Sequence, residues 1–120
     1  MPAIRTFRDL VVWQKGIALA KLVYSLSRNF PPEEKFGLAS QIRRAAVSVP
    51  SNIAEGQARN TRGEFIQFLS HAEGSLAELD TQLRISNEIG FCSNAESSGV
   101  LAQILELQKM LKALRGKLTV

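Results

Sequence analysis

The side chains that could carry chemistry in this 120-residue chain are few, and four arginines are the main candidates. Arg59 and Arg62 flank the expected start of a helix, and Arg43 and Arg44 lie on the helix before it. A helix N-terminus offers free N–H groups and a positive dipole end, and arginine binds phosphate through paired donors. These four residues are therefore predicted to bind nucleic acid. The alternative is an ordinary solvated surface, since Glu64 competes for the same N–H groups.

The groups that catalysis or metal binding would need do not form a recognisable set. His71 is the only histidine and Cys92 the only cysteine, whereas a zinc or redox site needs more ligands of these types. A di-iron bundle needs a Glu-x-x-His motif, and the residue three before His71 is Phe68. No glycine-rich phosphate loop is present. We expect a protein that is not an enzyme and that has no cofactor, metal site or catalytic residue.

Composition indicates one globular domain over residues 1–120, with 45% hydrophobic and 22% charged residues. A lone cysteine fits the reducing cytoplasm, and Lys15 and Lys21 interrupt the longest apolar run, so no membrane span is expected. The net charge of +4 is unevenly distributed, because residues 1–62 hold ten basic and four acidic side chains. This asymmetry is compatible with an anionic partner or with head-to-tail self-association.

Apolar residues recur at helical spacing in four segments, at about 9–28, 33–58, 62–89 and 94–118. The third and fourth segments each carry one apolar seam. The seam of the third is Phe65, Leu69, Ala72, Leu76, Leu79, Leu83 and Ser86, and that of the fourth is Val100, Ile104, Leu107, Leu111, Leu114 and Leu118. No stretch alternates with a period of two. The predicted fold is an all-α, antiparallel up-down four-helix bundle.

The first segment carries two apolar stripes, and the sequence does not decide which one faces the core. One stripe is Leu10, Trp13, Ile17, Ala20 and Tyr24, and the other is Val12, Leu19, Val23, Leu26 and Phe30. A surplus of apolar surface usually marks an interface, so we expect a homo-oligomer, with Val12, Leu19 and Val23 among the candidate contacts. Trp13 and Tyr24 are interpreted as core residues. Nucleic-acid recognition is therefore expected to be mostly of the backbone.

Pro50 lies inside the second segment, where it removes an N–H group and displaces the carbonyl of Ala46. We expect a kink, or a break with an immediate restart. Three polar neighbours could bond the freed backbone groups: Ser48, Ser51 and Asn52.

A second interpretation of this segment concerns Asn52 and Glu55. Together with Arg43 or Arg44, they would form a polar contact inside the bundle or across a subunit interface. The helix ends are marked by two capping boxes, Thr61 with Glu64 and Ser93 with Glu96, and by a C-terminal glycine, Gly90.

Four stretches of the chain resemble a known family. They are 7–15 (FRDLVVWQK), 41–56 (QIRRAAVSVPSNIAEG), 64–69 (EFIQFL) and 74–79 (GSLAEL). Together they resemble a bacterial four-helix-bundle family that includes proteins encoded by intervening sequences of 23S ribosomal RNA genes. The resemblance extends over nearly the whole chain.

The resemblance implies a four-helix bundle that assembles into a ring-like homopentamer, with no enzymatic activity. The chain is also similar to the accessory protein of diversity-generating retroelements, a basic pentameric barrel that binds nucleic acid and a reverse transcriptase. The implied partners are copies of the chain itself, RNA or DNA, and a protein such as a reverse transcriptase. The alternative function is a structural or protein-interaction scaffold with no nucleic-acid role.

Overall fold

The computed structural model describes residues 6–119, which form four long helices and two short 3-10 helices. Their bounds are η1 Phe7–Asp9, α1 Val11–Ser27, η2 Pro32–Phe36, α2 Leu38–Gln57, α3 Arg62–Glu88 and α4 Asn94–Thr119. Within this part of the chain no residue is in a strand, which confirms the all-α class. Arg5, one of the ten basic residues of the first half, lies outside the described residues.

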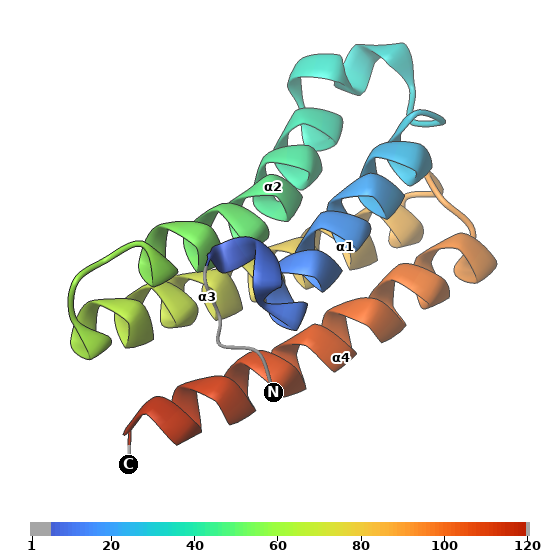
Figure 1. Cartoon of the computed structure of the whole chain (residues 1–120). Coiled ribbons are helices and arrows are strands. Elements are labelled where there is room, and N and C mark those ends of the chain that lie inside the picture. Colours follow the sequence, from blue (N-terminus) through green and yellow to red (C-terminus); the bar gives the residue numbers. More distant parts are fainter. Residues whose placement is uncertain (1–5, 120) are drawn as a thin grey trace.

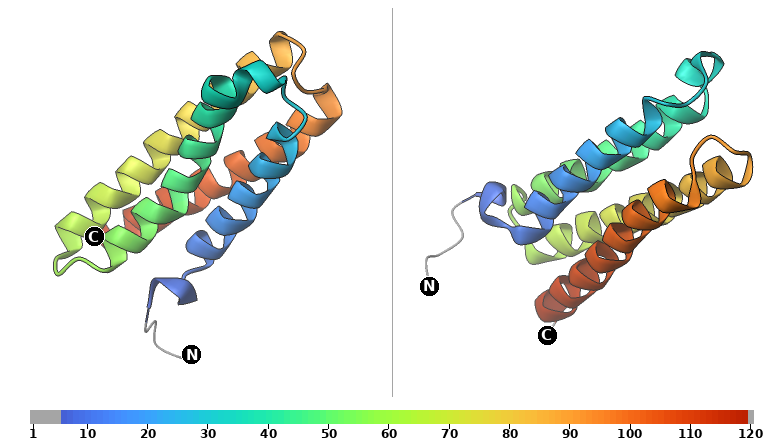
Figure 2. Two further views of the ribbon diagram at one scale, coloured as in Figure 1. Left: turned by 90° about the horizontal axis from the view of Figure 1, so that it is seen from above. Right: turned by 90° about the vertical axis from the view of Figure 1, so that its right-hand side faces the viewer.

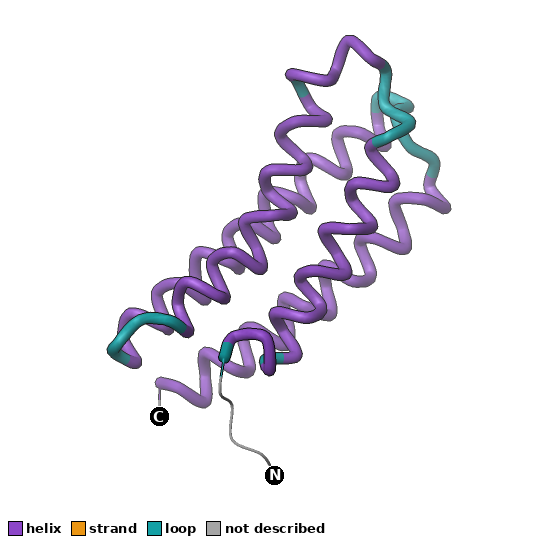
Figure 3. Tube along the Cα trace, turned by 45° about the horizontal axis from the view of Figure 1, so that its top comes forward, coloured by secondary structure: helices purple, strands orange, loops and turns teal. Residues whose placement is uncertain are grey.

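The four helices lie side by side around one core (Figures 1 and 2). α1 and α3 each contact both α2 and α4. The links between successive helices alternate between the two ends of the molecule (Figure 3). None of the helices within residues 6–119 is long and apolar enough to cross a membrane.

The two predicted seams lie in the core. On α3, every seam position from Leu69 to Ser86 is buried. Phe65, the first seam position, is half-buried and packs against the core. On α4, Val100, Ile104, Leu107 and Leu111 are buried, whereas Leu114 and Leu118 are half-buried. The 3,4 spacing of leucine-rich residues thus identified the inward face of both helices.

On α1 the second stripe is the core stripe, and Val12, Leu19 and Val23 are buried within the chain. They are therefore not available as interface contacts. The first stripe lies on the flank of the helix: Trp13 is half-buried, but 38% of Ile17 and 41% of Tyr24 remain exposed. The interpretation of Tyr24 as a core residue is wrong. It lies at the surface where α1 meets α2, with Arg43 of α2 over its ring.

α2 passes through Pro50 without a break. The segment expected at 33–58 is divided instead near Gly37, between η2 and α2. The hydroxyl of Ser48 donates to the carbonyl of Ala45 (2.7 Å), and the side-chain amide of Asn52 donates to the carbonyl of Ser48 (2.8 Å). These bonds differ from the expected ones, since neither reaches the carbonyl of Ala46.

Small residues let α2 approach both neighbouring helices. A Cβ placed on Gly16 of α1 would lie 3.2 Å from the Cβ of Pro50, and one placed on Gly56 of α2 would lie 2.6 Å from the Cβ of Phe68 on α3. A contact of 2.6 Å between carbon atoms is far inside van der Waals distance. Gly56 therefore permits the packing of α2 on α3.

Both predicted capping boxes form hydrogen bonds. The hydroxyl oxygen of Ser93 accepts from the N–H of Glu96 (3.1 Å), and the carboxylate of Glu96 accepts from the N–H of Ser93 (2.9 Å). These bonds lower the pKa of Glu96. At α3, Thr61 caps the N–H of Glu64 (3.1 Å), but the carboxylate of Glu64 accepts from the Thr61 hydroxyl instead of its N–H. Gly90 has a φ of 85°, as a C-terminal capping glycine requires.

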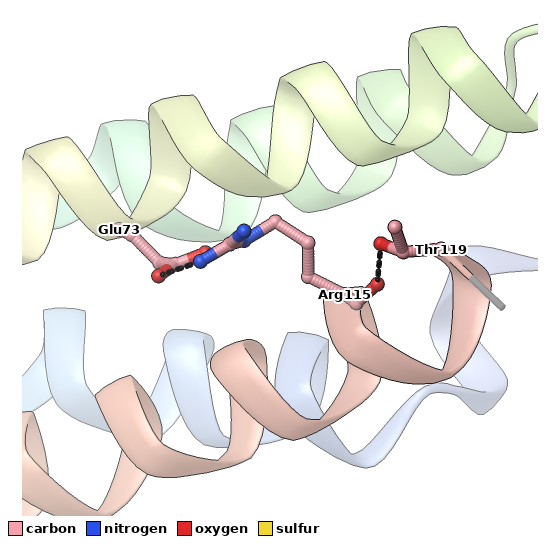
Figure 4. A network of polar contacts seen from close by, with 3 residues as sticks. All are labelled: Glu73, Arg115 and Thr119. Atoms are coloured by element: carbon pink, nitrogen blue, oxygen red, sulfur yellow. Dashed lines mark hydrogen bonds and ion pairs between the residues drawn. The ribbon is translucent and has the colours of Figure 1, made fainter.

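Two ion pairs join α4 to its neighbours. Lys15 of α1 lies 2.5 Å from the carboxylate of Glu106. Arg115 donates two hydrogen bonds, of 2.6 and 3.1 Å, to the carboxylate of Glu73 on α3, and these bonds raise the pKa of Arg115. Figure 4 shows this pair beside the hydroxyl of Thr119, which donates to the carbonyl of Arg115 (2.7 Å).

The substitution Leu76→Ala is expected to lower the free energy of unfolding by ~2–5 kcal/mol, because the residue is fully buried at the centre of the α3 seam. Leu105→Ala is the matched control on α4, where 52% of the side chain is exposed, and it should change stability by less than about 0.5 kcal/mol. Urea unfolding followed by circular dichroism measures both. Equal losses in the two variants would contradict the assigned core.

The substitution Gly56→Ala should destabilise the protein even though alanine favours helix formation by about 1 kcal/mol. Its Cβ has no room against Phe68, and overpacking typically costs about 1–3 kcal/mol. Gly74→Ala on α3 is the control, because no other group lies within 4 Å of its added Cβ, and it should raise the melting temperature. If both substitutions raised the melting temperature, the spacing of α2 and α3 would have adjusted to the added Cβ without loss of stability.

Candidate nucleic-acid interface

The four predicted arginines form two pairs, one within α2 and one at the link between α2 and α3. Arg43 and Arg44 belong to the first half of α2, Arg59 follows its last turn, and Arg62 is the first residue of α3. Because a helix rises about 1.5 Å per residue, about 20 Å of α2 lies between Arg44 and the end of the helix at Gln57. The structure thus keeps the two pairs apart.

Arg43 is held against α1. The carbon of its guanidinium lies 4.8 Å from the centre of the Tyr24 ring, and its Nε donates to the hydroxyl oxygen of Ser27 (2.7 Å). Ser27 is buried, and its own hydroxyl donates to the carbonyl of Tyr24 (3.3 Å). A cation over an aromatic face is attracted by the ring quadrupole. The orientation of Arg43 is therefore fixed by two contacts with the same helix.

Arg44 is exposed and has no ion-pair or hydrogen-bond partner among residues 6–119. It borders two open grooves. The groove between α1 and α2 has a volume of about 430 Å³ and is lined by Tyr24, Arg43, Arg44, Val47, Ser48 and Ser51. The groove between α2 and α3 has a volume of about 550 Å³ and is lined by Gln41, Arg44, Ala45, Ser48, Ser75 and Glu78.

The second pair has the same composition of one stacked and one free arginine. Arg59 lies 4.8 Å above the ring of Phe68 and forms an exposed ion pair with Glu55 (3.2 Å). Arg62 is exposed, and no described residue bonds or pairs with its guanidinium. The carboxylate of Glu64 lies at the same helix start, and it reduces the attraction of this N-terminus for phosphate.

The residues of the Pro50 segment take structural positions. Pro50 is buried against Gly16, and Asn52 bonds within its own helix. Glu55 pairs with Arg59. Among the described residues, neither Asn52 nor Glu55 is bonded to Arg43 or Arg44.

The residues considered for catalysis lie apart from one another. His71 is exposed on α3, with its ring edge-on to Phe68 at 5.7 Å. Cys92 is buried in the link before α4, and burial together with the nearby charge of Glu96 raises the pKa of its thiol. A raised pKa disfavours the reactive thiolate. Residues 6–119 contain no cluster of three or more His, Cys, Asp or Glu side chains placed to hold a metal ion.

The aromatic partners of the arginines were missed by sequence reasoning. Tyr24 precedes Arg43 by nineteen residues, and Phe68 follows Arg59 by nine, with a different helix in each case. No local spacing signals such a contact. For Tyr24, the surplus apolar stripe of α1 is a signal, because one of the two stripes has to lie nearer the surface.

Comparison with known proteins identifies the family. The sequence model of the family described as 23S rRNA-intervening sequence protein matches residues 8–113. None of the curated proteins matches the chain.

A solved structure shares the fold. It is the 1.70 Å crystal structure of a protein with unknown function from the S23 ribosomal protein family of Bacteroides thetaiotaomicron. The two chains are 22% identical, with a TM-score of 0.79, and the match covers 88% of this chain and 98% of that one. Because the family match spans nearly the whole sequence, the chain belongs to the 23S rRNA-intervening sequence protein family.

Proposed function

We propose that this chain is a cytoplasmic, non-enzymatic protein that binds the phosphate backbone of RNA or DNA. The observation that carries the proposal is the pair of exposed, unpartnered guanidinium groups, Arg44 and Arg62, each beside an arginine stacked on an aromatic ring. Guanidinium groups bind phosphate oxygens in a bidentate manner.

The spacing of the two pairs suits a contact with one nucleic-acid strand. Because most of the length of α2 lies between them, the two pairs would contact different phosphates of the same strand. Stacking on Tyr24 and Phe68 restricts the conformations of Arg43 and Arg59 before any ligand binds. Less conformational entropy is then lost on binding.

We further propose that the protomer is an antiparallel up-down bundle that assembles into a homo-oligomer, a pentamer by family resemblance. Several large apolar side chains outside the α1–α2 groove are exposed and available for such contacts: Val11, Leu22, Phe36, Ile85, Ile89 and Leu105. Five copies of a chain of charge +4 would carry a charge of +20 and five copies of each arginine pair. Repeated weak contacts with one strand raise the overall affinity.

The same exposed apolar residues favour a second candidate function, a scaffold that binds a protein such as a reverse transcriptase. Phe36 is 88% exposed, an unusual solvent exposure for a phenylalanine. A protein-binding scaffold would show little affinity for nucleic acid at any salt concentration. The salt dependence of RNA binding therefore separates the two functions.

The double substitution Arg44→Gln with Arg62→Gln should weaken RNA binding and reduce the slope of log K against log salt concentration, because each arginine contacts phosphate. Fluorescence anisotropy with a labelled RNA hairpin, between about 50 and 200 mM salt, measures both quantities. The control variant, Arg84→Gln with Lys109→Gln, removes the same charge from α3 and α4. If both double variants weaken binding equally, only net charge matters. If the parent binds no RNA at low salt, the scaffold function is favoured.

The mass of the native particle tests the oligomer. Light scattering at micromolar concentration is expected to give about five times 13.2 kDa. A monomer under native conditions would disprove the proposed assembly.

A further inference from the structure

The groove between α1 and α2 combines an aromatic ring, two guanidinium groups, an apolar side chain and two hydroxyl groups. We call it the Tyr24 groove, defined by Tyr24, Arg43, Arg44, Val47, Ser48 and Ser51. Its volume is about 430 Å³, and it is open to solvent. Of these lining residues, all within the described part of the chain, none is acidic. The groove therefore suits an anionic occupant.

Tyr24 gives the groove a flat surface. Tyr24 is 41% exposed although Arg43 lies over its ring, so part of this stacked pair remains accessible to solvent. The bond from Arg43 to the buried hydroxyl of Ser27 fixes the guanidinium in this position. Unpaired nucleobases stack on both aromatic rings and guanidinium planes. Val47, which is 42% exposed, adds an apolar contact beside them.

The polar groups of the groove fit the rest of a nucleotide. Arg44 has no partner among residues 6–119, and it is available for a phosphate group. The hydroxyl of Ser48 donates its hydrogen to the carbonyl of Ala45, so its oxygen remains an acceptor. Ser51 is exposed one helical turn further along α2. An oxygen acceptor and a second hydroxyl suit the 2′-hydroxyl of a ribose or the edge of a base.

We propose that the Tyr24 groove holds one unpaired nucleotide of single-stranded RNA, with its base against the Tyr24–Arg43 pair and its phosphate at Arg44. This inference rests on the proposed nucleic-acid function and adds a preference to it. In an A-form duplex the base faces are covered by their stacked neighbours, so the groove would accept only loops, bulges or single strands. Each copy of the chain would then recognise both the backbone and an exposed base.

The test compares a labelled short oligouridylate with a labelled RNA duplex of the same length at one salt concentration. The parent should bind the single strand more tightly. Tyr24→Ala should lower the affinity for the single strand by about 5- to 150-fold, which corresponds to the ~1–3 kcal/mol of a base–aromatic stack. Tyr24→Phe keeps the ring and should bind as the parent does. No charge is changed, so the salt dependence should stay constant. In Tyr24→Ala, Arg43 loses its stacking partner, so the affinity for the duplex should fall slightly, and by much less than the affinity for the single strand.

Phe36→Ala is the matched control, because Phe36 is an exposed aromatic residue with a cation, Lys35, 5.6 Å from the centre of its ring, yet it lies outside the groove. A Phe36→Ala variant that keeps the native mass of the parent should bind the single strand with unchanged affinity. Melting temperature and native mass are measured for each variant. Should Tyr24→Ala fail to fold, Tyr24→Leu replaces it, since leucine keeps apolar bulk but has no ring.

Three results would overturn the inference: equal affinity of the parent for single strand and duplex, no loss in the folded Tyr24 variant, or an equal loss in Phe36→Ala. If the duplex is still bound and Arg44→Gln with Arg62→Gln still weakens that binding, backbone recognition stands without the base site. If the parent binds neither RNA, both the proposed function and this inference fail.

Discussion

The close approach of α2 to α1 and α3 is the constraint on which the other features depend. Gly16 leaves room for Pro50, and Gly56 leaves room for Phe68, so that both neighbouring helices come near the backbone of α2. At these separations, Tyr24 on α1 can lie beneath Arg43, and Phe68 on α3 can lie beneath Arg59. Wider helix spacing would separate each arginine from its ring. The backbone packing of α2 thus sets the position of the cations at its surface.

The fold could be predicted where a residue's environment depends on its own helix. Leu76 and Leu111 each belong to a helix with a single apolar seam, so only one face of that helix can be buried. Ser93 and Glu96 cap a helix through hydrogen bonds between residues three apart. Tyr24 shows the limit of this reasoning. Two apolar stripes on one helix offer two inward faces, and the choice depends on which flank of α1 lies against α2. The choice between the two stripes of α1 therefore depends on the packing of α2, which the sequence of α1 alone does not specify.

The sequence suggests which arginines could form the candidate site, but not which of them have partners within the chain. The sequence identifies Arg43, Arg44, Arg59 and Arg62, whereas their availability depends on neighbours from other turns and helices. Arg43 bonds to Ser27 and Arg59 pairs with Glu55, so of these four arginines Arg44 and Arg62 are the two without a partner among the described residues. The basic first half and acidic second half of the chain are likewise partly neutralised in space, because Lys15 pairs with Glu106 across α1 and α4.

The contact between Arg115 and Glu73 lies at the end of α4, where the inward side chains are least buried. Beyond Leu111, the inward side chains of α4 are only half-buried, so this end is held mainly by Leu114, Leu118 and the ion pair. Few buried apolar contacts give a segment a low free energy of local opening. We therefore expect the amide hydrogens of the last two turns of α4 to exchange with solvent by local fraying, and those near Ile104 and Leu107 to exchange only when the whole bundle unfolds.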